Sequence, residues 1–188
     1  MICTTIQNRT AEQIVEALEQ CEMAEIRLDS CVLSAREMED VFTSDVPLVA
    51  TCRIAEVMKN EPSLQDLPDA TREVKAMMLA EKRLVRAIEA GADGIGLFRS
   101  EFLYMQSSSE PTEQQQYEAY AAAARACNGK PITIRTLDIG GDKAVPYLGF
   151  AKEENPFLGW RAIRVCLECR EMFCRQLRAI LRASAEGD

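Results

Sequence analysis

GIGLFR, residues 94–99, is a short apolar run of strand length that ends in an arginine. Three more stretches have the same form, each an apolar run closed by an arginine. They are MAEIR at 23–27, PLVATCR at 47–53 and ITIR at 132–135. Together with the apolar opening at 2–6, these stretches predict five β-strands. The segments between them have helical periodicity, so the alternation predicts a parallel sheet with right-handed crossovers.

A closed parallel barrel needs eight strand–helix units, and this chain supplies about five. The sequence therefore predicts an α/β fold, a partial TIM barrel of about five of the eight units. An open five-stranded sheet is the alternative. In both cases the sheet has exposed edges, and such edges favour self-association.

Two capping boxes predict helix starts, Thr10 with Gln13 and Ser34 with Glu37. Helical periodicity also predicts three buried helix faces. Their members are Ile14, Val15 and Leu18; Val74, Met77, Met78, Leu84, Val85 and Ile88; and Met172, Phe173, Leu177, Ile180 and Leu181.

The composition is that of a globular protein. The chain has 188 residues, 47% of them hydrophobic and 28% charged, which suits one domain or slightly more. No apolar run approaches the roughly 20 residues of a membrane helix, and no basic-then-apolar start suggests a signal peptide. Eight cysteines with this distribution indicate reduced thiols, so we expect a cytoplasmic protein with no membrane partner.

Charge is unevenly spread along the chain. Residues 1–93 hold 10 Lys+Arg against 18 Asp+Glu, whereas residues 94–188 hold 12 of each. The net charge of −8 excludes a basic footprint for nucleic acid. The chain has no histidine, so a mechanism that needs an imidazole of this chain is excluded.

The arginines that close the four runs are Arg27, Arg53, Arg99 and Arg135. In a parallel barrel the carboxyl ends of the strands face one shared site. Guanidinium groups offer fixed, paired donors that suit carboxylates and phosphates. The pattern therefore predicts a small anionic substrate.

Four stretches before residue 94 share the pattern of one enzyme family. They are ICTTI at 2–6, EIRLD at 25–29, VATCR at 49–53 and AEKRLVRAIEAGAD at 80–93. On these stretches residues 1–93 resemble a type I 3-dehydroquinate dehydratase. The resemblance implies that Glu25, Arg27 and Arg53 line a site for 3-dehydroquinate. That family also uses a Schiff-base lysine and a histidine, neither of which has a match here, so we expect no dehydration chemistry.

After residue 93 the resemblance changes. The stretches GIGLFRSEFLYM at 94–105, ITIRTLDIGGDK at 132–143, ENPFLGWRAIR at 154–164 and QLRAILRAS at 176–184 resemble the phosphoenolpyruvate (PEP)-binding barrel of enzyme I of the sugar phosphotransferase system. The resemblance implies that Arg99 and Arg135 grip the phosphate of PEP. It also implies Mg²⁺ as a cofactor. We expect the acidic ligands of Mg²⁺, a further arginine, the catalytic cysteine and the phosphohistidine domain to lie outside these 188 residues.

The two resemblances meet at residues 91–94, where the charge distribution also changes. We therefore expect a hybrid, with a dehydratase-like half-barrel segment at 1–93 and an enzyme-I-like PEP-binding segment at 94–188. The predicted function is PEP binding of the phosphotransferase kind without catalysis, and no residue of the chain is predicted to be catalytic or to bind metal. Two alternatives stay open, a site of the dehydratase kind from the shikimate pathway at Glu25, Arg27 and Arg53, and a non-catalytic scaffold.

Three smaller motifs have simple explanations. Cys166 and Cys169 form a single CxxC inside a helical pattern, which favours core packing over zinc. The turn at 140–143 lacks the glycine spacing of a P-loop but could contact an anion. The Asn-Pro pair at 155–156 predicts a helix start, and Trp160 is expected in the core.

Overall fold

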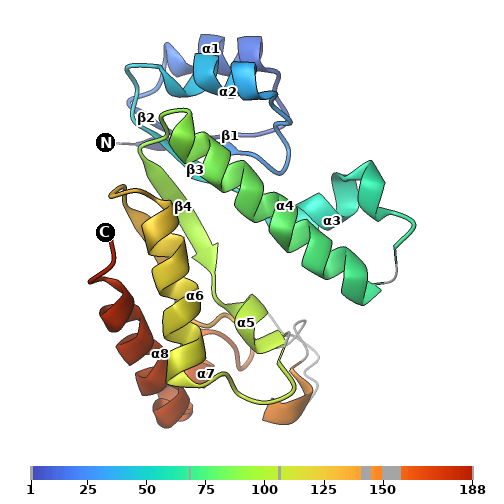
Figure 1. The fold of residues 1–188 in the computed structure, drawn as a ribbon, viewed down its shortest axis with the longest axis vertical. Helices are drawn as coiled ribbons and strands as arrows, with labels where there is room; N and C mark the ends of the chain where they lie inside the picture. The colour runs from blue at the N-terminus through green and yellow to red at the C-terminus, as the bar shows by residue number, and fades with distance from the viewer. Residues whose placement is uncertain (1, 68, 106, 141–144, 150–157, 188) are drawn as a thin grey trace. The chain divides into compact units, whose positions relative to one another are not determined.

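The computed structural model describes residues 2–67, 69–105, 107–140, 145–149 and 158–187. The chain divides into two compact units, Met1–Gly96 and Leu97–Asp188 (Figure 1). Five strands follow one another in the sheet order β1-β2-β3-β4-β5, and the pairs β1–β2, β2–β3 and β3–β4 are parallel. The predicted α/β class is therefore confirmed, with the strand number of a partial barrel.

The first unit contains three complete strands and the start of a fourth. The pairing sets Ala24 of β2 beside Leu48 of β3, and Ala50 of β3 beside Ile95 of β4. The elements are β1 (Cys3–Ile6), α1 (Ala11–Leu18), β2 (Met23–Arg27), α2 (Ala35–Phe42), β3 (Leu48–Thr51), α3 (Ile54–Asn60), the 3₁₀ turn η1 (Pro62–Leu64), α4 (Asp69–Glu89) and β4 (Gly94–Arg99), whose last three residues belong to the second unit.

Both predicted capping boxes are present in this unit. Thr10 accepts from the backbone of Gln13 and Ser34 from that of Glu37, with the reciprocal side-chain bonds also formed. The predicted helix faces are partly wrong, because Val15 is exposed while Ile14 next to it is buried. α1 is short and buries only a narrow stripe of its surface.

The segment between β3 and α4 includes two short helical elements. It contains α3 and η1, and each buries one apolar side chain, Val57 and Leu64. α3 packs against α4. Met78 of α4, predicted on the buried face, is exposed.

The second unit begins within β4 and is mainly helical around β5. Its α6 helix packs along α8, as Figure 1 shows for the yellow and red helices. The elements after β4 are α5 (Glu101–Met105), α6 (Glu113–Ala126), β5 (Ile132–Arg135), the 3₁₀ turn η2 (Pro146–Leu148), α7 (Ile163–Glu168) and α8 (Arg170–Ala183).

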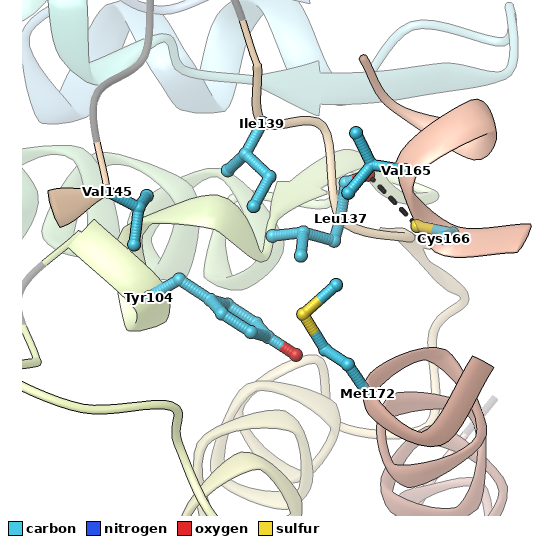
Figure 2. Packing of buried hydrophobic residues seen from close by; sticks show 7 residues of the cluster. All are labelled: Tyr104, Leu137, Ile139, Val145, Val165, Cys166 and Met172. Atoms are coloured by element: carbon cyan, nitrogen blue, oxygen red, sulfur yellow. Dashed lines mark hydrogen bonds between the residues drawn. The ribbon is translucent and has the colours of Figure 1, made fainter. Parts of the chain in front are cut away.

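An apolar cluster fills the space beside β5. Figure 2 shows Leu137 between the Tyr104 ring and Cys166, whose thiol is 3.5 Å from the Leu137 carbonyl oxygen. Core packing of Cys166 is therefore confirmed. Trp160 is half-buried and also packs against this cluster, as expected. The buried members are Tyr104, Leu137, Ile139, Val145, Val165, Cys166 and Met172.

A second cluster joins α6 to α8 and is built from small residues and one ring. Tyr120 and Ala121 of α6 meet Ala179 and Ala183 of α8, all fully or almost fully buried. Leu181, predicted on the buried face of α8, is exposed. Small side chains let the two helices approach closely, so the apolar stripe of α8 is narrower than its leucines suggested.

Some predictions fall outside the described residues, namely most of the turn at 140–143 and the helix start at 155–156. All eight cysteines are free thiols, and four of them are buried. Among the helices of the described residues, none has the length and apolarity that a membrane span requires.

Candidate functional site

The ends of β4 and β5 carry two arginines that face one acidic residue. β4 ends at Arg99 and β5 at Arg135, and the next helix after β4 begins at Glu101. The Glu101 side chain is fully buried, whereas the side chains of Arg99 and Arg135 are 17% and 34% exposed. A buried carboxylate is retained only where cations or donors offset its desolvation.

Glu101 binds both arginines through the same oxygen. Nε and Nη2 of Arg99 each lie 2.8 Å from Glu101 Oε1, and Nη2 of Arg135 lies 2.5 Å from it. These are charge-assisted hydrogen bonds, the stronger kind in proteins. One carboxylate therefore holds two guanidinium groups of neighbouring strands side by side.

Two further contacts extend the cluster. The Arg99 guanidinium carbon is 5.0 Å from the centre of the Phe102 ring, a cation–π distance. On the other side, Asp138 accepts from Arg135 at 3.2 Å and from Arg161 at 3.0 Å. The result is an alternating row of three arginines and two carboxylates, here called the arginine–carboxylate row: Arg99, Glu101, Arg135, Asp138 and Arg161.

Buried polar bonds tie this row to α8. Ser100 lies between Arg99 and Glu101 in sequence, and its hydroxyl donates to the Arg135 carbonyl at 2.7 Å. Gln176 of α8 donates to that hydroxyl at 3.1 Å and accepts from the Leu137 backbone N–H at 2.8 Å. Both side chains are buried. The strand ends that carry the two arginines are therefore fixed to the unit's core.

A different polar cluster lies on the first three strands of the first unit. Glu25 of β2 accepts from the Thr5 hydroxyl of β1 at 2.8 Å and from the Thr51 hydroxyl of β3 at 2.5 Å. Each carboxylate oxygen thus takes a hydroxyl from one neighbouring strand.

Arg27, predicted to bind an anion, already has an internal anionic partner. Its Nε donates to Asp29 Oδ1 at 2.9 Å and its Nη2 pairs with Asp29 Oδ2. Both side chains are almost completely buried. Arg53 is exposed, and its backbone N–H also donates to Asp29, at 3.0 Å.

This pairing changes the protonation of both groups. The hydrogen bond to Asp29 raises the pKa of Arg27, against an opposing effect of burial. Burial raises the pKa of Asp29, but the hydrogen bonds from Arg27 and from the Arg53 backbone outweigh it and hold that pKa below 3.8. The pair is therefore fully ionised near neutral pH.

The five predicted site residues thus fall into two sets. Arg99 and Arg135 end β4 and β5, while Glu25 and Arg27 belong to β2 and Arg53 follows β3 in the first unit. The sequence analysis missed the acidic members, Glu101, Asp138 and Asp29. A signal for them exists, because an acid follows each of Arg27, Arg99 and Arg135 by two or three positions.

A metal site is not evident. The described part of the chain contains no group of three or more histidine, cysteine, aspartate or glutamate side chains arranged to hold an ion. Both carboxylates of the arginine–carboxylate row are occupied by guanidinium groups. In the described residues these two carboxylates are thus engaged in ion pairs, and Mg²⁺, which needs only one or two carboxylates together with water and phosphate oxygens, stays an expectation of the enzyme I resemblance.

Residues 58–188 match the family model described as PEP-utilising enzyme, PEP-binding domain. The phosphoenolpyruvate-protein phosphotransferase of Staphylococcus carnosus (strain TM300) is 50% identical over 137 residues, 69% of this chain and 24% of that protein. The protein of that name from Latilactobacillus sakei is 48% identical over 132 residues, 70% of this chain and 23% of its own length. The one from Geobacillus stearothermophilus is 60% identical over 102 residues, 54% and 18%.

The chain spans only about a fifth to a quarter of the length of these relatives. The family match, however, covers well over half of this chain, including both strands that end in Arg99 and Arg135. The chain therefore belongs to the family of PEP-utilising enzymes, through their PEP-binding domain.

Proposed function

We propose that the arginine–carboxylate row of the second unit binds the phosphate group of PEP. The observation that carries the proposal is the pair of guanidinium groups at the ends of adjacent strands, bound to one buried carboxylate oxygen. The pair lies inside the residues that match a PEP-binding family. Three arginines against two carboxylates leave the row with one excess positive charge, which suits an anionic ligand.

The chemistry of this site is binding and orientation. Guanidinium groups present N–H donors in a fixed plane and match the oxygens of a phosphate. Arg99 and Arg135 keep part of their surface exposed, so a ligand reaches them from solvent. Phosphoryl transfer to a histidine of this chain is excluded by composition. We therefore propose a PEP-binding segment that does not itself catalyse the transfer.

Calorimetric titration of the purified chain with PEP tests this proposal. Arg99→Lys keeps the charge but removes the planar fork, and we expect it to weaken PEP binding about tenfold or more, the size expected for loss of a charge-assisted bond. Arg178→Lys is the matched control, because Arg178 is exposed on α8 and pairs with Glu113 at 2.8 Å. Absence of PEP binding by the unmodified chain, or equal binding by Arg99→Lys, would contradict the proposal.

The effect of Mg²⁺ on the affinity for PEP provides a second test. Because both carboxylates of the arginine–carboxylate row are paired with guanidinium groups, we propose that the guanidinium groups bind PEP without help from a metal ion. The dissociation constant measured in EDTA should then equal that measured with Mg²⁺. A strong requirement for Mg²⁺ would contradict binding by the guanidinium groups alone.

The first unit is a candidate for a second ligand. We propose Glu25, Arg27 and Arg53 as the site at which 3-dehydroquinate would bind. In favour is the origin of one carboxylate and two arginines from β2 and from the residues that follow its neighbour β3. The internal pairing of Arg27 with Asp29 leaves mainly Arg53 for the ligand. A parallel titration with 3-dehydroquinate decides, and no heat of binding would leave the first unit as scaffold only.

We also propose a hybrid organisation, with a joint between the dehydratase-like segment 1–93 and the PEP-binding segment 94–188 at residues 91–94. The change in charge balance at this point favours the joint. The family match begins earlier, at residue 58, and so also covers the last part of the first segment. Amplification of one transcript that covers all 188 codons from the source cells would support a natural hybrid, and two separate transcripts would argue against it.

Two expectations about the whole molecule complete the proposal. β1 and β5 lie at the two ends of the strand order, so we propose self-association through strand edges. A single sharp monomer peak in light scattering would contradict it.

The eight free thiols support a reducing compartment such as the cytoplasm. Cell fractionation with an antibody against the chain would test this localisation.

A further inference from the structure

Glu101 is an unexpected neighbour for a phosphate site. Its carboxylate is fully buried and carries the same sign of charge as the proposed ligand. A negative group beside the anion should weaken binding by Coulomb repulsion. Its place between Arg99 and Arg135 therefore needs a function that outweighs this cost.

The geometry shows what Glu101 does to the two arginines. It takes the Nε–Nη2 edge of Arg99 and the Nη2 group of Arg135. The Phe102 ring lies against the face of the Arg99 guanidinium. Among the described residues neither arginine has a partner for its Nη1 group. Glu101 and Phe102 thus hold the guanidinium group of Arg99, while Glu101 and Asp138 hold that of Arg135. Each guanidinium group keeps its Nη1 amino group for a ligand.

We propose that Glu101 is a positioning residue, which sets the spacing and orientation of Arg99 and Arg135 before the anion arrives. Two guanidinium groups this close repel each other, and each long side chain loses rotamer freedom when it is ordered. The carboxylate offsets both costs in the unliganded protein. The ligand then meets donors that are already in place, which is the usual origin of gains from preorganisation. This inference rests on the proposed binding of PEP at the same arginines.

Glu101→Gln separates positioning from charge by the sign of its effect. The variant makes the row more positive by one charge, so simple electrostatics predicts tighter binding of PEP. Loss of positioning predicts weaker binding, and we expect the dissociation constant for PEP to rise about tenfold or more. Binding that is equal to or tighter than that of the unmodified chain would overturn the inference.

Glu113→Gln is the matched control. Glu113 is also a carboxylate of the second unit that binds two arginines, Arg178 at 2.8 Å and Arg182 at 2.9 Å. The substitution changes the net charge by the same amount, but the carboxylate belongs to α6 and pairs with arginines of α8. We expect its affinity for PEP to stay within about twofold of the unmodified chain.

Glu101→Asp covers the case in which the glutamine variant does not fold. It keeps the charge and shortens the side chain by one carbon, so one carboxylate can no longer reach both arginines. We expect PEP binding between that of the unmodified chain and that of Glu101→Gln. Unchanged binding in a folded Glu101→Asp protein would show that the position of the carboxylate does not matter.

NMR of the arginine side chains keeps the inference testable even if PEP does not bind. In the unmodified chain the Nε–H of Arg99, bonded to Glu101 at 2.8 Å, should exchange slowly with water. Glu101→Gln should speed this exchange. The Nε–H groups of Arg135 and Arg161 should be affected less strongly. An unchanged Arg99 signal would overturn the positioning role; a changed signal without PEP binding would refute only the proposed function.

Discussion

Arg27 ends β2 in the first unit, and Arg99 ends β4; in each case an acidic residue follows two positions later. In the first unit Asp29 folds back on Arg27 and takes both its Nε and Nη2, so that the pair is closed and buried. In the second unit Glu101 reaches past Arg99 to Arg135 of the next strand, and both arginines keep an exposed part.

The difference follows from the cations that surround each acidic residue. Asp29 is bound by its own Arg27 and by the backbone N–H of Arg53, and no second guanidinium group binds it within the described part of the chain. Glu101 is bound by its own Arg99 and also by Arg135, which ends the neighbouring strand. The same pattern of strand, arginine and acid thus yields a structural ion pair in one unit and a pair of available cations in the other.

The largest effect is expected where the closed pair is broken. Asp29→Ala leaves the buried Arg27 without its partner and removes the acceptor of the Arg53 backbone N–H. Such a loss destabilises a protein by about 3–5 kcal/mol. Urea unfolding followed by far-ultraviolet circular dichroism measures it. Fluorescence of the single tryptophan, Trp160, reports on the second unit and should change little.

A glycine in each unit gives a matched pair of smaller effects. Gly91 and Gly140 have φ values of +119° and +123°, and an added Cβ would lie 2.7 Å from the Phe42 carbonyl oxygen or 2.6 Å from that of Trp160. We expect each alanine variant to lose about 1–3 kcal/mol from the backbone conformation alone. Gly91→Ala should lower the urea midpoint measured by circular dichroism. Gly140→Ala should lower the urea midpoint measured by tryptophan fluorescence. A shared shift of both signals would show that the units unfold together.

The next largest effect is expected from low pH, which protonates Asp29 and so weakens its pair with Arg27. The pKa of Asp29 is lowered in the folded protein, so the native state binds fewer protons than the unfolded state. Its contribution to stability is therefore complete above the ordinary value of 3.8 and is lost as the pH falls through the lower folded value. Urea midpoints between about pH 6 and pH 2.5 should fall more steeply for the unmodified chain than for Asp29→Asn. Parallel curves would show that Asp29 is not the group that titrates.

Thiol reactivity gives the smallest effect. Burial raises the pKa of Cys52 to about 12, and the thiolate is the form that reacts. Cys174 is exposed on α8. Alkylation with iodoacetamide followed by peptide mass spectrometry should modify Cys174 first and leave Cys52 unmodified until the protein is unfolded in urea. Early modification of Cys52 in the native protein would contradict its burial.

The sequence predicted the strands and their arginines well, because an apolar run with a terminal cation is a local signal. It failed where the outcome depends on distant partners. Nothing local distinguishes Ile14 from Val15, yet only Ile14 is buried. Glu101, at the start of a helix, has the sequence context of a solvated residue, but it is buried because Arg135 comes from a strand more than thirty residues later.

The two arginines that end β2 and β4 supply the most direct test of the account. PEP would be titrated into the unmodified chain and into Arg27→Lys and Arg99→Lys in the calorimeter. We predict that Arg99→Lys loses at least about tenfold in affinity while Arg27→Lys, which loses stability, binds PEP as the unmodified chain does. Loss of binding in Arg27→Lys with retention in Arg99→Lys would contradict the assignment of the PEP site to the second unit.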